Sequence, residues 1–223
     1  MDRIAQYYFN LDTMARFLPD LWQGFLITLQ MAVLVVVFGL ALGLVLAMIR
    51  AFGIKPANYL MVFLVDLFRA IPPLVVIICC YFALPYAGVR FSPFTATVLS
   101  LIAILGAFAE EIFWAGITSV ERGQWEAGRA TGLSFTQTLI WIVMPQGVRL
   151  AIPPLTNRTV AITKQTALGS AVAVPEILSQ ASSAQSIAAN PSPLTLGAAM
   201  YILLFLPFVA LSRWVERRYG WAK

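Results

Sequence analysis

The sequence predicts an all-α, polytopic membrane protein with five transmembrane helices. Of its 223 residues, 60% are apolar and only 11% are charged, whereas about a quarter of the residues in a soluble domain are charged. Uncharged apolar runs of roughly 20 residues recur along the chain, and a helix of that length crosses the hydrocarbon core of a bilayer. No linker separates two halves, so we expect a single domain.

The apolar runs set the expected elements in order. Residues 1–20 mix charged and aromatic side chains, which is typical of an interfacial segment ahead of the first span. The membrane domain covers 21–218 and leaves a short cytoplasmic tail, 219–223. In the first span, Gly39 and Gly43 form a Gly-x-x-x-Gly pattern that lets another helix approach closely. The five spans are expected at approximately 22–50, 58–86, 91–118, 139–168 and 194–213.

Prolines mark irregularities in two of these spans. Pro72 and Pro73 lie inside the second span and should kink it or break its hydrogen-bond ladder. Broken helices near mid-membrane point to a solute path, although prolines are also common in spans for packing reasons. Residues 176–193 are polar, which predicts a loop with room for a short helix. The fourth span is expected to be interrupted by Pro145, Pro153 and Pro154.

The distribution of Lys and Arg predicts the orientation, because cytoplasmic loops carry the excess of basic residues. Five crossings put the two ends of the chain on opposite sides of the membrane. One set of loops holds only Arg3, Arg16 and Arg90. The other set is expected in the cytoplasm, together with the C-terminus, while the N-terminus lies outside. Its basic residues are Arg50, Lys55, Arg122, Arg129, Arg213, Arg217, Arg218 and Lys223.

Ionisable side chains within the spans are costly and usually line a pathway or pair with each other. Asp66 and Arg69 lie three apart on one helix, and we expect them to pair. Glu110 and Glu111 are neighbours that point roughly 100° apart, so one can face a pathway while the other finds a different partner. A mixed set of acids and bases suits a zwitterionic or polar solute, but a structural ion-pair network would look the same. The full set is Asp66, Arg69, Glu110, Glu111, Arg158 and Lys164.

A polar stretch at 119–136 separates the third and fourth spans and faces the cytoplasm in this topology. A short polar helix held at the membrane surface offers a docking surface to a partner outside the membrane. An ordinary amphipathic loop is the alternative. The centre of the stretch reads Glu126-Ala127-Gly128-Arg129-Ala130-Thr131-Gly132.

The chain lacks residues that several classes of protein need for their function. The chain has no histidine, which argues against Ser-His-Asp hydrolases and the common metal centres. Cys79 and Cys80 are adjacent in an apolar run and act most simply as small hydrophobic residues. No Gly-x-x-x-x-Gly-Lys-Ser/Thr loop is present for ATP. We therefore expect no enzyme activity, no cofactor or metal in this chain and no nucleic-acid partner.

From Glu126 onward the sequence resembles the cytoplasmic signature of ABC importer membrane subunits. That signature reads Glu-Ala-Ala, three residues, Gly, nine residues, then Ile-x-Leu-Pro. The spacing here is the same, with Gly and Met at two positions: Glu126-Ala127-Gly128, Gly132 and Ile142-Val143-Met144-Pro145. Matches over roughly 20–220 narrow the resemblance to permeases for polar amino acids, namely Arg69 to Val75, Gly116 to Gln124, Pro145-Gln146, Arg149, Pro153 to Asn157 and Trp214 to Arg218.

The resemblance implies a five-span permease of the bacterial inner membrane that pairs with an identical or similar second permease subunit. A coupling helix at approximately 122–133 would dock on a separate cytoplasmic ABC ATPase, which binds ATP and Mg, while an external binding protein delivers the solute. The implied coupling residues are Gln124, Glu126, Ala127, Gly128, Arg129 and Gly132, with Gly132 allowing the chain to turn. The implied substrate-pathway residues are Arg69, Glu110, Glu111, Arg158, Lys164, Gln165 and Thr166.

Two departures from the family pattern bear on the solute. In the third span an acid is added and a base lost, because Glu110-Glu111 is followed by Trp114 where the family has Arg. In the fourth span the family tends to have Lys-Asp-Thr-Ser-Leu, whereas this chain has Lys164-Gln165-Thr166-Ala167-Leu168 and so lacks an acid and a hydroxyl. Our hypothesis is an amino acid or related compound that is not strongly anionic.

Three alternatives stay open from the sequence. The first is a permease of the same architecture that carries another small polar solute, such as an opine or a modified amino acid. A secondary transporter or channel needs no ATPase, and the signature at Glu126 argues against it. A purely structural membrane subunit would tolerate Glu126→Arg.

Overall fold

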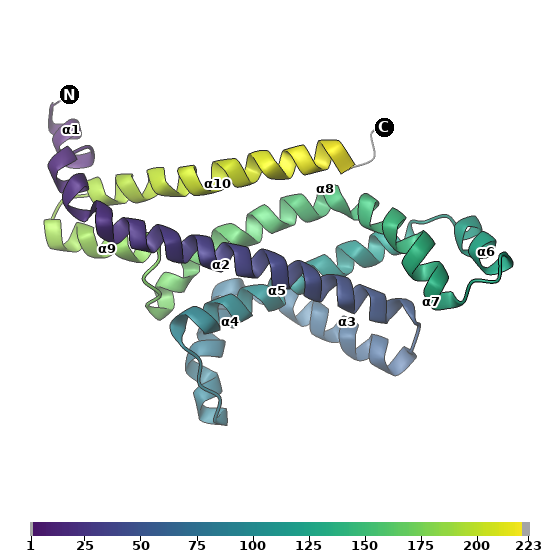
Figure 1. Cartoon of the computed structure of the whole chain (residues 1–223). Coiled ribbons are helices and arrows are strands. Elements are labelled where there is room, and N and C mark those ends of the chain that lie inside the picture. The colour runs from purple at the N-terminus through teal and green to yellow at the C-terminus, as the bar shows by residue number, and fades with distance from the viewer. Residues whose placement is uncertain (1, 220–223) are drawn as a thin grey trace.

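A computed structural model describes residues 2–219, and all the regular elements in that range are helical (Figure 1). Four helices are long and apolar enough to cross a membrane, and the number rises to five when one bent helix pair is counted as a single span. The predicted all-α fold is confirmed, and the predicted five spans agree with the larger count. The spanning helices are α2 (Leu11–Ala51), α3 with α4 (Lys55–Ala70 and Pro73–Ile78), α5 (Pro93–Thr118), α8 (Met144–Thr163) and α10 (Ser192–Tyr219).

The centre of the molecule is the pair formed by α2 and α5. Small residues let the two backbones meet, as the Gly-x-x-x-Gly pattern predicts. A Cβ on Gly43 would lie 2.5 Å from the Cβ of Ala109, so any side chain there would push the helices apart. Apolar side chains such as Val35 and Leu105 are fully buried along the same contact. Together they form the core on which the other spans pack.

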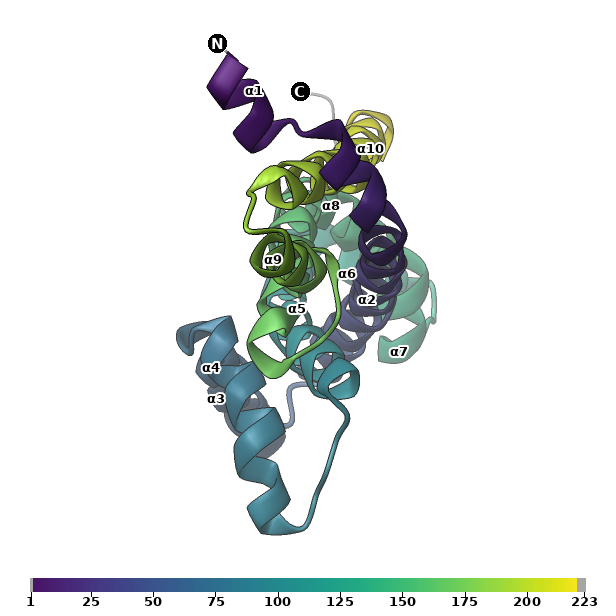
Figure 2. The same cartoon turned by 90° about the vertical axis from the view of Figure 1, so that its left-hand side faces the viewer.

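The second span bends by 106° between α3 and α4. Ile71 is extended, with φ −81° and ψ 133°, because the residue before a proline avoids the helical region. The predicted break at Pro72 and Pro73 is therefore confirmed. The chain then continues through a π-helical turn, η1 (Cys79–Ala83), and a 3-10 turn, η2 (Leu84–Ala87). In Figure 2 this arm extends away from the rest of the bundle.

The fourth span is irregular but does not break at its prolines, so the prediction that they interrupt the helix was wrong. Helical structure runs over 38 residues from Phe135 to Val172. Its parts are α7 (Phe135–Thr138), the π-helical η3 (Leu139–Val143), α8 and the 3-10 helical η4 (Lys164–Val172). Pro145 follows directly after the π-helical η3, so the helix is irregular at this proline although it does not break. Pro153 and Pro154 lie inside α8, which the burial of Ala151 and Leu155 holds in place.

The outer elements close the bundle at one end. The short α1 (Asp2–Tyr8) precedes Asn10, whose side chain accepts the N–H of Thr13 and caps α2, so this helix starts within the expected interfacial segment. Residues 176–193, expected as a loop, contain α9 (Ile177–Ala188). The backbone N–H of Asn10 donates to the hydroxyl of Ser192, at the start of α10. Residues 220–223 of the expected tail lie outside the described residues.

Candidate functional site

The first candidate region is a set of ion pairs in the C-terminal half of α5. Glu110 is fully buried, and both its carboxylate oxygens accept hydrogen bonds from Arg50 at the end of α2, at 3.0 and 3.3 Å. The Arg50 guanidinium also lies 4.7 Å from the ring centroid of Trp114. The negative charge of Glu110 is thus neutralised inside the bundle.

Glu111 forms an ion pair with a different arginine. Arg69 of α3 donates to Glu111 at 2.5 Å and to Asp66 at 3.2 Å. The expected Asp66–Arg69 pair is therefore present, and the two neighbouring glutamates find separate partners, as their roughly 100° offset predicts. Both acids around Arg69 remain partly open, with the Asp66 side chain 61% exposed and that of Glu111 44% exposed.

Phe108 connects this group to the fourth span. The guanidinium of Arg158 on α8 lies 4.0 Å from its ring centroid, and that of Arg69 lies 5.5 Å from the same centroid. Cations are attracted to the faces of aromatic rings at these distances. Three of the predicted pathway residues, Arg69, Glu111 and Arg158, are thereby brought together around one aromatic side chain.

The remaining predicted pathway residues lie elsewhere. Lys164, in the first turn of η4, lines a pocket of about 460 Å³ that faces α10 and includes Tyr201. Gln165 has a buried amide oxygen without a hydrogen-bond partner among the described residues. Thr166 is buried and donates its hydroxyl to the carbonyl of Thr163, so it presents no polar group to a path.

Two partners of the predicted residues were missed by sequence reasoning. Arg50 was counted only as a loop cation, although it ends the first span on the same side as Glu110 near the end of the antiparallel third span. The similar depth of Arg50 and Glu110 in the membrane could have predicted this ion pair. Phe108 carried no signal, because one aromatic residue in an apolar helix is ordinary.

The opposite end of the bundle holds a second fully buried glutamate, which the sequence analysis did not single out. Glu176 caps α9 by accepting the N–H groups of Leu178 at 3.0 Å and Ser179 at 2.7 Å. The hydroxyl of Tyr201 on α10 donates to the same carboxylate at 2.5 Å. Burial raises the pKa of Glu176, and these three hydrogen bonds oppose that shift.

The second candidate region is α6 (Arg122–Ala130), a helix between the third and fourth spans that lies beyond one end of the bundle (Figure 1). Arg122 and Glu126 pair at 3.2 Å, and their side chains are 92% and 69% exposed. Gln124 accepts a hydrogen bond from Gln146 at the start of α8. Arg129 donates to the carbonyl of Leu133 at 3.0 Å. The exposed charged face is available to a partner.

Two glycines of this segment have identifiable structural roles. A Cβ on Gly128 would lie 2.8 Å from side-chain carbons of Thr138 and Ile142, so glycine lets α6 pack closely on the fourth span. This contact explains why glycine stands where the signature has alanine. Gly132 has φ +89°, in the left-handed region that glycine adopts without strain, and it turns the chain towards α7.

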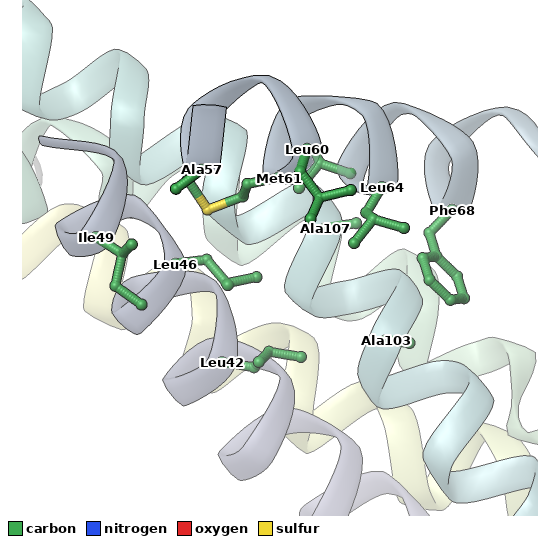
Figure 3. A pocket seen from close by; sticks show the side chains of 11 residues that line it. Leu42, Leu46, Ile49, Ala57, Leu60, Met61, Leu64, Phe68, Ala103 and Ala107 are labelled. Atoms are coloured by element: carbon green, nitrogen blue, oxygen red, sulfur yellow. The ribbon is translucent and has the colours of Figure 1, made fainter. Parts of the chain in front are cut away.

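The groove drawn in Figure 3 has a different character from the charged regions. It holds about 360 Å³ between α2, α3 and α5, and all its lining residues are apolar, including Leu42, Leu64 and Phe68. Such a surface offers no partner to a polar solute and suits lipid chains. Metal chemistry also finds no support here, because no group of three or more Cys, Asp or Glu side chains in the described range could hold an ion.

Comparisons with known proteins agree with this architecture. The sequence model of the family described as "Binding-protein-dependent transport system inner membrane component" matches residues 39–221. The chain is 35% identical to the probable glutamine ABC transporter permease protein GlnP of Bacillus subtilis over 74% of this chain and 75% of the relative. It is 33% identical to the glutamine transport system permease protein GlnP of Escherichia coli K12 over 90% and 93%.

A solved structure described as an amino acid ABC transporter with histidines superposes with a TM-score of 0.82. The superposition covers 92% of this chain and 96% of the other, at 30% sequence identity. The likeness therefore extends over nearly all of both chains.

Proposed function

This chain belongs to the inner-membrane components of binding-protein-dependent transport systems, and from that premise we propose that it carries polar amino acids through the bilayer. It is a permease subunit of an ABC importer, a transport component rather than an enzyme. The names of the curated relatives, two of which are glutamine permeases, support an amino acid as the solute.

The proposed assembly needs three kinds of partner. A separate ABC ATPase holds ATP and Mg and supplies the energy, since this chain carries no phosphate-binding loop. An external solute-binding protein, which the family description itself names, delivers the amino acid. A second permease subunit, identical or homologous, completes the path across the membrane.

We assign the coupling role to α6 and the turn after it. The observation that carries this assignment is an exposed, charged helix anchored to the fourth span through Gly128 and the Gln124–Gln146 hydrogen bond. A movement of α6 would thus pass directly to α8. The exposed Glu126, Ala127 and Arg129 would contact the ATPase, the buried Gly128 would pack against the fourth span, and Gly132 would set the turn.

The arrangement of the basic segments supports the proposed orientation in the membrane. The α2–α3 turn with Lys55, the α6 segment and the C-terminal end of α10 all lie towards one end of the bundle (Figure 1). Basic residues concentrate on these segments, which supports a cytoplasmic location for them. The N-terminus and α9 would then face the outside of the plasma membrane.

The translocation path is proposed to run along α8 and the open side of the Phe108 group. Arg69, Glu111 and Arg158 offer charged groups around one ring, and Lys164 lies farther along the fourth span. Charged groups within spans normally face a water-filled cavity or a partner subunit. Glu110 and Thr166 would serve this path as structural residues, because both are fully buried.

Glu126→Arg tests the proposed coupling. Purified from its native membranes, the wild-type chain should bring an ATPase and a second permease with it and support ATP-dependent uptake. Charge reversal in the docking face should reduce both ATPase recovery and uptake by roughly tenfold or more. Asp20→Arg makes the same charge change on an exposed residue near the N-terminal end of α2, far from α6. This variant should leave ATPase recovery and uptake unchanged. Equal behaviour of the two variants would contradict the proposal.

A further inference from the structure

Three aromatic side chains form a continuous row from α6 to the end of α2. The ring of Trp125 on α6 stacks on that of Phe135, the first residue of α7, with centroids 5.4 Å apart and planes inclined by 23°. The ring of Phe135 also lies 5.8 Å from that of Phe52, which follows α2 directly, at an angle of 56°. Ring pairs at these separations attract each other. The aromatic row of Trp125, Phe135 and Phe52 thus connects α6 to the first span.

The backbone on both sides of the second ring contact is held by hydrogen bonds. Ser134 and Gln137 form a capping box at the start of α7, in which each side chain accepts the backbone N–H of the other residue, at 3.3 and 2.8 Å. The amide of Asn58, in the first turn of α3, donates to the carbonyl of Arg50 at 3.0 Å and fixes the α2–α3 turn. A displacement of one ring is therefore passed to the next segment instead of being absorbed by a loose loop.

The rings of Phe52 and Phe135 lie outside the buried core. Phe52 is 46% exposed and Phe135 is 38% exposed, and neither belongs to the apolar clusters that hold the spans together. Substitutions at such exposed positions usually have small effects on stability. Core packing therefore explains these two rings poorly, and their contacts can be removed without unfolding the chain.

The far end of the aromatic row lies next to the ion pair that ties α2 to α5. Arg50 is two residues before Phe52 and binds Glu110 at 3.0 Å. The proposed coupling helix α6 thus contacts two parts of the bundle: the fourth span through Gly128, and the central α2–α5 pair through the aromatic row. Through both contacts together, a movement of α6 would shift the fourth span and the central pair in one step.

We infer that the aromatic row is a second connection between the coupling helix and the spans, with Phe135 as its positioning residue. This inference rests on the proposed function and deepens it, because it adds a connection to the first span beside the one to the fourth. In this role Phe135 contacts neither ATP nor solute, and its ring keeps α6 and the end of α2 at a fixed separation. Without the ring, the end of α2 would follow α6 incompletely, and transport per ATP would fall.

The test compares uptake with ATP hydrolysis in the same vesicles, which hold the complete transporter with its co-purified ATPase, second permease and binding protein. The probe is a labelled mixture of the standard amino acids, supplied together with ATP. Phe135→Leu keeps an apolar side chain but removes the ring. This variant should retain ATPase recovery and ATP hydrolysis, while the uptake per ATP hydrolysed falls about fivefold.

Two variants serve as matched controls. Phe135→Tyr keeps the ring and should retain the wild-type uptake per ATP. Phe63→Leu makes the same substitution at a 63% exposed residue of α3 that stacks on no ring among the described residues, and it should also leave the ratio unchanged.

A double variant tests whether the rings act as a unit. Phe52→Leu breaks the aromatic row at its other contact and should give the same loss of uptake per ATP as Phe135→Leu. Combining the two substitutions should add no further loss, because both remove one connection.

The contrary results have separate meanings. Unchanged uptake per ATP in Phe135→Leu, or losses that add in the double variant, overturns the role of the aromatic row and leaves the permease function intact. Loss of ATPase recovery in Phe135→Leu, as expected of Glu126→Arg, would assign the ring to the docking surface and also overturn that role. If Phe135→Leu is not inserted in the membrane, Phe52→Leu decides alone, since Phe52 lies outside the regular helices. Failure of the wild-type complex to take up any standard amino acid overturns the proposed function, and this inference with it.

Discussion

The two fully buried glutamates, at opposite ends of the bundle, are stabilised by different means. Glu110 meets a full positive charge, the guanidinium of Arg50. Glu176 meets no cation among the described residues and depends on two backbone N–H groups and the hydroxyl of Tyr201. The same side chain at the same burial is therefore compensated by charge in one place and by hydrogen bonds in the other.

The difference has a structural consequence. An ion pair joins two spans firmly but needs both members, since either alone is a buried charge. Hydrogen bonds from a helix start and a hydroxyl tolerate a change of protonation, so the cluster at Glu176 is the one that responds to pH. We expect the Arg50–Glu110 pair to hold α2 against α5 as a rigid unit. The Glu176 cluster joins α9 to α10 in a manner that depends on the protonation of Glu176.

The largest effect is expected from removing one member of the Arg50–Glu110 pair. Arg50→Met leaves Glu110 as an unpaired buried charge, and loss of one partner of a buried ion pair costs about 3–5 kcal/mol. The measurement is the unfolding free energy of the purified chain in detergent. The double variant Arg50→Met with Glu110→Met fills the space with apolar groups and should recover most of the loss. A double variant no better than the single one would show that Arg50 acts through contacts other than Glu110, such as Trp114.

A smaller, pH-dependent effect is expected at the Glu176 cluster. Burial raises the pKa of Glu176, so the folded chain binds this proton more tightly than the unfolded chain. The contribution of this group is thus fully present below the ordinary carboxyl pKa and declines as the pH rises towards the folded pKa. Tyr201→Phe removes a hydrogen bond to the ionised form, raises that pKa further and costs about 1.5–3 kcal/mol where Glu176 is ionised.

Thermal unfolding of Tyr201→Phe should therefore differ least from the wild type at low pH and increasingly as the pH rises. Tyr59→Phe is the matched control, because Tyr59 is 77% exposed and its substitution should have no pH-dependent effect. A constant difference at all pH values would mean that Tyr201 contributes by packing alone.

The difference between the two glutamates also explains which features of the fold could be predicted from the sequence. Hydropathy predicted the spans, and the Gly-x-x-x-Gly pattern predicted a close helix contact at Gly39 and Gly43, because both depend on local composition. The structure shows that the helix in contact is α5. The partner of Glu110 was missed because it depends on how α2 and α5 align along each other. The expected break at Pro153 and Pro154 was wrong because tertiary packing outweighs local preference.

The candidate site was predicted only in part, for a related reason. Arg69, Glu111 and Arg158 do meet, but Lys164 and Thr166 face other surroundings. The π-helical turn at 139–143 and the 3-10 segment at 164–172 change the number of residues per turn, so side chains drift from the positions that a regular helix would give them. Sequence patterns do not reveal such changes of helix type.

The smallest effect is expected where a carboxylate is not buried at all. Asp66 pairs with Arg69 like its neighbours, yet its side chain is 61% exposed. Exposed pairs contribute about 0–1 kcal/mol, so Asp66→Asn should change the unfolding free energy by less than that amount in the assay used for Arg50→Met. Asp66→Asn also leaves Arg69 bound to Glu111. A loss comparable with that of Arg50→Met would mean that a partner subunit buries Asp66, and burial rather than pairing would then decide the cost of each carboxylate.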